Sequence, residues 1–558
     1  MQTRSETLRL SDSATYDVCV IGGGASGAGC ALDAQLRGLR TLLVEGADFA
    51  SRTSSASTKM AHGGIRYLQA AFANLDLRQY RLVSHAVRER ALMLRNAPHL
   101  TATQEFLVPC FTRGEQFYYG AGLKIYDWIA GRASLARSRV LSFDHAVRRL
   151  PALHRRGLLG AVSYADGQFD DSRYGLALVT TFVRAGGTAL NYVKAMDFER
   201  ARNGQIAALS VEDRITGRTF TVRARVFVNA TGPFSDAVRR LASPGTESRL
   251  RPSKGVHLLF PLDAGWNGDG LLVPKTEDGR VVFALPYGGR LLVGTTDNAA
   301  SPNAEMVITR QEIDYLIRQI NPYLERPLHA SDVVSGFAGI RPLVQSRNSM
   351  ETSKLIRDDE VEVDPRSGLI SILGGKWTTY RLMAEKTIDR VQAALGLAVG
   401  GCATRNARLA GSEGYHADYW RELMEGGLPE PTARHLAHKF GTDAVRVLQL
   451  ANEDDDLASP LVDGAPPIQA EVVYAVRHEM ALTVDDVLAR RTGLELYDWR
   501  MAIEAAPAVA WLMGREMGWS PAEVRRASNE YIAKIDRLLK VAGLAEHLEK
   551  HSGLRPPV

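Results

Sequence analysis

Cysteine is scarce in this sequence, and long apolar runs are missing from it. The chain has 558 residues and four cysteines, which form no C-x-x-C pair: Cys19, Cys30, Cys110 and Cys402. We therefore expect a reducing compartment, with neither disulfides nor a zinc site. No apolar stretch approaches the ~20 residues that a membrane-spanning helix needs. The length predicts two or three domains with a large core.

The N-terminal segment lacks the apolar region of a secretory signal. Residues 1–15 are rich in serine and threonine and contain both arginines and acids. We expect a disordered lead-in here, and a transit peptide is the alternative.

Positive charge is distributed unevenly along the chain. The net charge is +5, but residues 59–156 contain sixteen Lys/Arg and only six Asp/Glu. Such an excess favours an acidic substrate or an anionic membrane face, and an ordinary solvated surface is the alternative. No segment resembles a nucleic-acid-binding motif, so no nucleic acid partner is expected.

A glycine-rich turn lies between two expected strands near the N-terminus. Residues 16–21 predict a buried parallel strand, and a G-x-G-x-x-G pattern follows it at Gly22, Gly24 and Gly27. A helix, a second strand at 41–44 and then Glu45 complete a dinucleotide fingerprint. The glycines let a pyrophosphate approach the helix N-terminus. Glu45 is placed to accept from a ribose 2′-OH, which argues against NADP. The alternative is an ordinary glycine-rich turn.

The pattern of strands and helices predicts three parts. Two hairpins, at 206–222 and 281–294, indicate a β-rich domain inserted between pieces of the nucleotide-binding domain. Residues 16–395 are expected to form these two domains together, and 396–415 is a glycine-bearing linker. Residues 416–558 have helical spacing throughout and predict a separate all-α domain. The expected fold class is α/β + α, with a Rossmann-like domain, an antiparallel insert and a helical C-terminal domain.

Five further motifs make the assignment specific. They lie at 53–68, 230–233, 294–297, 336–343 and 374–381. In order and spacing these motifs resemble the FAD-dependent glycerol-3-phosphate dehydrogenases, and Leu488-Ala489-Arg490-Arg491-Thr492 is similar to a segment of the same family. Mitochondrial members have EF-hands after the helical domain. The sequence ends at Val558 without such a loop and so resembles the bacterial type.

The resemblance implies oxidation of sn-glycerol 3-phosphate to dihydroxyacetone phosphate by hydride transfer to FAD. Electrons are expected to pass to a membrane quinone, and the protein to be cytoplasmic, bound peripherally to the cytoplasmic face of the inner membrane. One alternative is an oxidase of the same fold that uses oxygen and acts on glycerol 3-phosphate or an amine. Another is a non-catalytic, FAD-stabilised scaffold that docks on a membrane. The oligomeric state is open, with a homodimer as one alternative.

A doubly charged phosphate needs fixed cations with planar donors, for which arginine is suited. Arg66 and Arg341 lie in glycine- or proline-containing loops and are the expected phosphate ligands, and surface ion pairs are the alternative. By resemblance, Tyr67, Thr296 and Asp297 are further substrate contacts.

Oxidation at C2 also needs a base for the hydroxyl proton, and histidine has a suitable pKa. His62 and His257 are the candidates, although a lone histidine is more often structural. Arginine has been placed in this role for the family, but a pKa above ~12 makes it a poor base. Substrate binding is therefore the preferred role for Arg341 over that of the base. Lys376 is expected to stabilise negative charge on the flavin, and a lysine that merely extends from a βα turn is the alternative.

The expected cofactor contacts are glycines and small or polar residues of these motifs. They are Gly22, Gly24, Gly27, Glu45, Ser54, Ser55, Ser57, His62, Gly63, Gly64, Ala230, Thr231, Gly232, Gly339, Gly375, Lys376 and Thr378. For the three serines, helix capping and turn formation are the alternative roles.

Residues 117–129 are apolar and aromatic, and Arg113 and Arg132 flank them. This combination suits the headgroup boundary of a membrane. The alternative is a buried core helix with two surface arginines.

Overall fold

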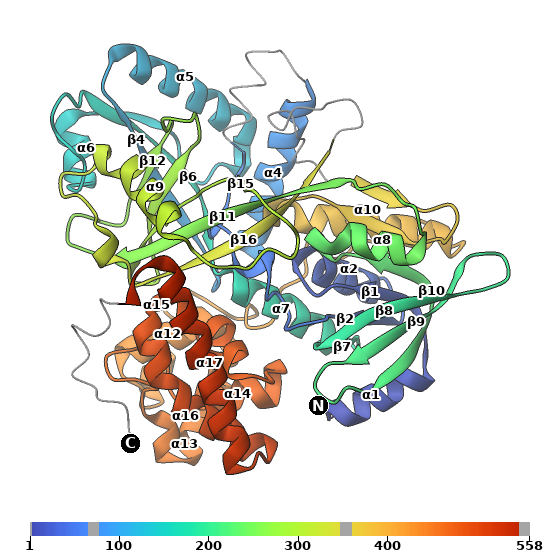
Figure 1. Ribbon diagram of the computed structural model, residues 1–558. Coiled ribbons are helices and arrows are strands. Elements are labelled where there is room, and N and C mark those ends of the chain that lie inside the picture. Colours follow the sequence, from blue (N-terminus) through green and yellow to red (C-terminus); the bar gives the residue numbers. More distant parts are fainter. Residues whose placement is uncertain (1–2, 65–76, 346–359, 546–558) are drawn as a thin grey trace.

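Two β-sheets and an all-α domain make up the computed structural model, which describes residues 3–64, 77–345 and 360–545 (Figure 1). The first sheet has the strand order β17-β18-β10-β1-β2-β7, with β9 and β8 added through β10. Its strands are β1 (Thr15–Ile21), β2 (Thr41–Val44), β7 (Thr188–Leu190), β8 (Val193–Arg200), β9 (Ile206–Asp213), β10 (Thr219–Asn229), β17 (Glu360–Val363) and β18 (Ile370–Leu373).

Strand β1 is the centre of this sheet and pairs in parallel with both β2 and β10. Its side chains alternate between two cores. Val18 and Val20 pack with the helices on one face, and Cys19 and Ile21 pack with the β8–β10 meander on the other. The covering helices are α2 (Ala25–Leu36), α7 (Asp171–Arg184) and α10 (Tyr380–Ala394), with α8 (Ser235–Ala242) on the second face. The predicted buried strand and the hairpin at 206–222 are both confirmed.

The second sheet is mostly antiparallel and has the order β15-β11-β14-β13-β12-β4-β6-β3, with β16 beside β11 and β5 beside β6. Its strands are β3 (Met60–Ala61), β4 (Thr101–Cys110), β5 (Arg139–Ser142), β6 (Gly160–Phe169), β11 (Leu250–Pro261), β12 (Gly270–Val273), β13 (Val282–Tyr287), β14 (Arg290–Gly294), β15 (Asn298–Ala299) and β16 (Ser335–Val344). The hairpin predicted at 281–294 is β13–β14.

Helices pack against both faces of the second sheet. They are α4 (Leu77–Asn96), α5 (Arg113–Ala130), α6 (Phe143–Arg149) and α9 (Arg310–Ile320). Helix α5 lies at the end of the molecule away from the all-α domain (Figure 1). Within the described ranges, no helix is both long enough and apolar enough to cross a membrane.

The all-α domain follows at the C-terminal side, as predicted. Its helices are α11 (Tyr419–Glu425), α12 (Glu430–Phe440), α13 (Ala444–Glu453), α14 (Ala470–Glu479), α15 (Leu494–Tyr497), α16 (Trp499–Met517) and α17 (Pro521–Ala542), and a π-helix spans Asp486–Arg491. One continuous core joins this domain to the second sheet, and it includes Trp499 of α16 together with Val256 and Leu258 of β11. The domain is therefore fixed against the sheet.

The prediction of a disordered lead-in at 1–15 is wrong. Residues Arg4–Ser13 form helix α1, which begins with a capping box between Thr3 and Glu6. The Arg4 guanidinium donates to the buried carboxylate of Asp213 at 2.7 Å and so fixes the helix against the β9–β10 turn. The composition of residues 1–15 could not predict this contact, because Asp213 lies 209 positions away in the sequence.

Candidate functional site

The glycine turn has no space for side chains. Gly22 has φ of +106°, and a Cβ on Gly27 would lie 1.8 Å from the Gly22 carbonyl oxygen. A Cβ on Gly24 would lie 2.9 Å from Ser54 Oγ. This close approach of α2 to β1 leaves backbone N–H groups at the helix N-terminus, which suit a pyrophosphate. The residues present therefore fit a dinucleotide cofactor.

Glu45 lies at the end of β2 and closes the turn. Its carboxylate accepts from Gly23 N at 2.6 Å and from Ala47 N at 2.9 Å. Burial raises the pKa of the Glu45 carboxyl, and these two donors oppose the rise. A carboxylate that accepts two N–H groups still has lone pairs for a hydroxyl donor, so the ribose contact is compatible with this geometry.

The three predicted serines are already engaged within the protein. Ser54 Oγ accepts from Ala25 N at 2.9 Å and so caps α2, whereas Ser55 Oγ donates to a backbone carbonyl. Ser57 Oγ donates to Asp171 Oδ2 at 2.7 Å. Capping and turn formation are therefore roles that all three perform.

Sequence reasoning missed a buried ion pair beneath this segment. Lys59 Nζ lies 2.5 Å from Asp171 Oδ1, and both side chains are almost fully buried. Asp171 also accepts from Ser57, so one carboxylate fixes the segment 57–59 to the start of α7. The partners are 112 positions apart in sequence, and no local pattern links them.

His257 lies on β11, where it faces the cofactor segment. Its Nε2 lies 2.9 Å from Thr58 Oγ1, and its ring stacks on Phe337 with centroids 4.7 Å apart. Its Nδ1 is buried and has no hydrogen-bond partner among the described residues. A Cβ on Gly294 would lie 2.1 Å from the ring, so this glycine makes the ring position available. Burial lowers the pKa of His257 well below its usual value, and the nearby charges of Arg341 and Lys59 add to this effect.

Arg341 lies on β16, next to β11. Its guanidinium donates to Thr295 Oγ1 at 2.8 Å, to the Thr296 carbonyl at 3.1 Å and to Asp297 Oδ1 at 3.4 Å. A Cβ on Gly255 would lie 2.2 Å from this guanidinium. The predicted substrate residues Thr296 and Asp297 are thus placed around Arg341. The Thr296 hydroxyl accepts from Val256 N in the strand, which is a structural contact.

Two further predicted cofactor residues, His62 and Gly63, follow strand β3. Gly63 N donates to buried Asp166, and a Cβ there would clash with the Tyr126 hydroxyl. His62 directly precedes Gly63 and follows β3.

The motifs at 374–381 and 336–343 both contact the segment 53–57. Lys376 follows Gly374 and Gly375, which have φ of +73° and +100°, and it immediately precedes a short 3₁₀ helix (Trp377–Thr379) that contains buried Thr378. Trp377 Nε1 donates to the Ser54 carbonyl at 2.7 Å. A Cβ on Gly339 would lie 2.7 Å from the Ala56 methyl group.

Other predicted cofactor positions also lie beside the glycine turn. Ala230, Thr231 and Gly232 follow β10, and a Cβ on Gly22 would lie 2.6 Å from the Ala230 carbonyl oxygen. Arg66 and Tyr67 lie outside the described residues.

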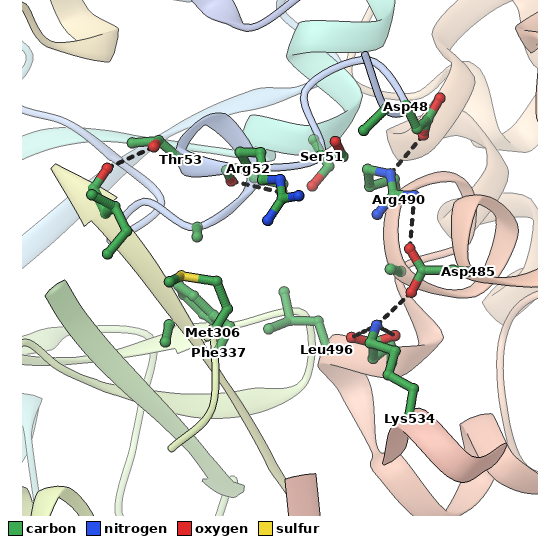
Figure 2. A pocket seen from close by; sticks show the side chains of 18 of the residues that line it. Asp48, Ser51, Arg52, Thr53, Met306, Phe337, Asp485, Arg490, Leu496 and Lys534 are labelled. Carbon is green, nitrogen blue, oxygen red and sulfur yellow. Dashed lines mark hydrogen bonds and ion pairs between the residues drawn. The ribbon is translucent and has the colours of Figure 1, made fainter. Parts of the chain in front are cut away.

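A cavity of about 440 Å³ lies between the segment 47–59, strand β16 and the all-α domain (Figure 2). Its walls combine apolar side chains such as Met306 and Leu496 with a row of ion pairs that runs from buried Asp48 to partly exposed Lys534.

Comparisons with known proteins agree with this arrangement. A family model described as FAD dependent oxidoreductase matches residues 17–381. A second one, described as the C-terminal domain of alpha-glycerophosphate oxidase, matches residues 402–524. These matches confirm the predicted fold class and the FAD cofactor.

Similar proteins extend over almost the whole chain. A probable mitochondrial glycerol-3-phosphate dehydrogenase of Caenorhabditis elegans is 40% identical over 535 residues, which cover 94% of this chain and 74% of that protein. The human mitochondrial glycerol-3-phosphate dehydrogenase is 39% identical over 92% of this chain and 72% of its own length. A solved structure of the glycerol-3-phosphate dehydrogenase from Bacillus halodurans complexed with FAD has a TM-score of 0.78 and 30% identity, and covers 96% of this chain and 97% of that one.

Proposed function

Because this chain belongs to the family of FAD-dependent glycerol-3-phosphate dehydrogenases, we propose that it passes the electrons of its substrate to a membrane quinone. The activity common to the family is the FAD-dependent dehydrogenation of glycerol 3-phosphate, and this chain has that activity. The quinone acceptor and the membrane surface are the proposed parts, as is a location on the cytoplasmic face of the inner membrane.

The observation that supports a role in substrate binding is the position of Arg341 beside His257. Bound FAD supplies the two-electron acceptor for the hydrogen at C2 of the substrate. Arg341 presents a guanidinium fork held by Thr295 and the Thr296 carbonyl, and a fork of this kind binds two phosphate oxygens at once. Arg66, although outside the described residues, is proposed as a second phosphate ligand.

His257 is the proposed base for the C2 hydroxyl. With the proton on Nε2, the ring donates to Thr58 Oγ1, and Nδ1 then has a free lone pair. The lowered pKa keeps this ring neutral at neutral pH, which is the form that accepts a proton. His62 is the alternative base. Lys376, at the start of a helix, is proposed to stabilise negative charge at the flavin.

A quinone acceptor lies in the bilayer, so the protein needs a surface that docks there. We propose that helix α5 provides it. Leu123 and Tyr126 are buried on one side, whereas Phe117 is 80% exposed and Trp128 is 74% exposed on the other. At 11 residues apart, these two aromatic rings lie on the same side of a helix. The helix is therefore half-buried, unlike the core helix that was the alternative.

Exposed basic side chains lie close to both ends of α5 in the sequence. Arg113, Arg132, Arg137 and Arg139 are exposed, and none forms an ion pair with any residue in the described part of the chain. Exposed aromatic residues with unpaired arginines close to them in the sequence suit an anionic headgroup layer. Each arginine near such a surface contributes about 1 kcal/mol, which salt screens.

A rapid-mixing experiment tests the acceptor. Glycerol 3-phosphate is expected to bleach the flavin absorbance under anaerobic conditions, and a soluble quinone analogue is then expected to restore it far faster than oxygen does. Fast restoration by oxygen would make the protein an oxidase instead. Absence of bleaching would remove the enzymatic assignment and favour a scaffold.

Sedimentation with liposomes tests the membrane surface. Trp128→Ala should weaken binding to anionic liposomes at low salt, and added salt should weaken binding of the unchanged protein. Trp511, which is 51% exposed on the all-α domain, gives the matched control in Trp511→Ala. Equal effects of the two variants, or equal partitioning onto neutral and anionic liposomes, would contradict docking through α5.

A further inference from the structure

A buried carboxylate joins the cofactor loop to the all-α domain. Asp48 is three positions after Glu45 and is 1% exposed. Arg490 Nε donates to its Oδ2 at 2.6 Å, and Arg491 forms a two-pronged contact with both of its oxygens, at 3.0 Å from Oδ1. Asn191 also donates to this carboxylate, at 3.1 Å. One acid in the loop after β2 thus accepts hydrogen bonds from two arginines of a domain that begins more than 360 positions later.

Both arginines belong to the segment 488–492, which sequence analysis singled out without a role. They lie at the end of the π-helix Asp486–Arg491, and Arg491 is fully buried. A second contact fixes each of them within its own domain. Arg491 donates to the Glu479 carbonyl at 2.7 Å, and Arg490 donates to Asp486 at 2.7 Å. Figure 2 shows the continuation of this row from Arg490 through Asp485 to Lys534 along one wall of the cavity.

The loop that contains Asp48 is attached at its other side to the glycine turn. Gly23 N donates to Glu45 at 2.6 Å, and Ala50 N donates back to the Gly23 carbonyl at 3.0 Å. Ala50 has φ of +57°, a conformation that a residue with a Cβ adopts only where its surroundings hold it. Asp48 lies between these two attachments. A displacement of Asp48 would therefore also displace Glu45 and the Gly23 backbone, which are the groups expected at the cofactor.

We propose that Arg490 and Arg491 are positioning residues of the FAD site, through which the all-α domain holds the loop 45–50 in its cofactor-binding conformation. A buried carboxylate without a partner is costly, so the loop takes this conformation only where the arginines are present. The charges of both arginines hold the pKa of Asp48 below its usual value although burial alone would raise it. This inference rests on FAD as cofactor and not on the identity of the electron acceptor.

A second bidentate pair across the same interface provides a matched control. Arg173 of α7 donates to both carboxylate oxygens of Glu479, each at 2.7 Å, and both side chains are buried. This pair joins the same two domains, but it does not contact the loop 45–50. Arg491→Lys and Arg173→Lys therefore remove one guanidinium fork each and preserve the charge.

The measurement is the rate at which the holoprotein releases FAD after dilution, followed by the recovery of flavin fluorescence. We expect both variants to lower the thermal midpoint. Arg491→Lys should release FAD at least about tenfold faster, the effect of one lost charge-assisted contact, whereas Arg173→Lys should leave the rate near that of the unchanged protein. Equal release rates in the two variants would overturn the proposal.

Should Arg491→Lys fail to fold, hydrogen exchange on the unchanged protein gives the same answer. Coupling between two sites is reciprocal, so bound FAD should protect the segment that holds its loop. We expect FAD removal to speed exchange of peptides in 483–492 far more than peptides in α13, which is in the same domain. Equal acceleration in both segments would mean that the domain responds as a whole and would overturn the positioning role.

Discussion

Thr58 Oγ1 lies 2.9 Å from His257 Nε2, and this contact joins the cofactor segment 53–59 to strand β11 of the second sheet. With the proton on Nε2, the ring donates to this hydroxyl, and Nδ1 is then the proposed basic atom. His257→Gln should therefore lower kcat by a factor of about 10² to 10⁴, the range for loss of a positioned base. Thr58→Val, which leaves the ring in place, should cause a smaller loss.

The pH dependence separates His257 from an ordinary histidine. Burial, with Arg341 and Lys59 nearby, lowers its pKa, so the ring stays neutral as the pH falls below 6.5. We expect kcat/KM of the unchanged protein to persist below pH 6.5. Its decrease on the acid side of the pH profile should be centred at a pH lower than 6.5. A limb centred near 6.5, or full activity of His257→Gln, would exclude His257 as the base.

Arg341 should discriminate between phosphorylated and unphosphorylated substrate. Arg341→Ala removes a charge-assisted contact of about 1.5–3 kcal/mol, so KM for glycerol 3-phosphate should rise by one to two orders of magnitude. KM for glycerol should change little, because glycerol has no phosphate. KM of Arg341→Lys for glycerol 3-phosphate should lie between those of the unchanged protein and Arg341→Ala, since lysine retains the charge without the fork. Steady-state kinetics with both substrates measures the ratio, and equal losses on both would exclude phosphate binding.

Gly255 provides a second test of the same site. A methyl group there would lie 2.2 Å from the Arg341 guanidinium and would displace it. Gly255→Ala should therefore raise KM for glycerol 3-phosphate in the same direction as Arg341→Ala. If Gly255→Ala binds substrate normally, the observed guanidinium position is not the functional one.

Local patterns were sufficient to predict much of the fold. The strand 16–21 and the hairpins at 206–222 and 281–294 all depend on neighbours within a few residues. The helical character of residues 416–545, the described part of the predicted domain, followed from spacing in the same way. In these segments the period of the apolar side chains determines the structure.

Contacts between distant residues were not predictable in this way. Lys59 pairs with Asp171 and Asp48 pairs with Arg491, and neither pair has a sequence period that links its members. The serines of the cofactor segment show the same limit, since the acceptor of Ser57 is Asp171 in another helix. Motif resemblance located the segments, but the partners that orient them depend on how the two sheets and the all-α domain pack.

Gly27 should be essential for cofactor binding. A Cβ there would lie 1.8 Å from the Gly22 carbonyl oxygen. Because that oxygen belongs to the backbone, the turn itself would have to move. Gly27→Ala should leave the purified protein with little FAD. Gly122 of α5 is the control, since a Cβ would meet nothing within 4 Å there. The measured quantity is the ratio of flavin to protein absorbance. A normal ratio in Gly27→Ala would contradict the assigned turn.

His99 should make the protein less stable in acid. It is 2% exposed, and burial lowers its pKa to about 3, with His438 and Arg173 adding to this effect and Asp170 opposing it. Below pH 6.5 the unfolded chain binds a proton here that the folded protein does not. The free energy of unfolding should therefore fall by about 1.4 kcal/mol per pH unit between 6.5 and 3 through this residue.

Substitution should remove that part of the dependence. Urea unfolding of His99→Gln at pH 7.5 and pH 5.0 should show a smaller loss of stability than the unchanged protein, by about 2 kcal/mol. Because a histidine that titrates freely in the folded state contributes no such slope, identical pH dependence of His99→Gln and the unchanged protein would show that the ring of His99 is accessible to protons.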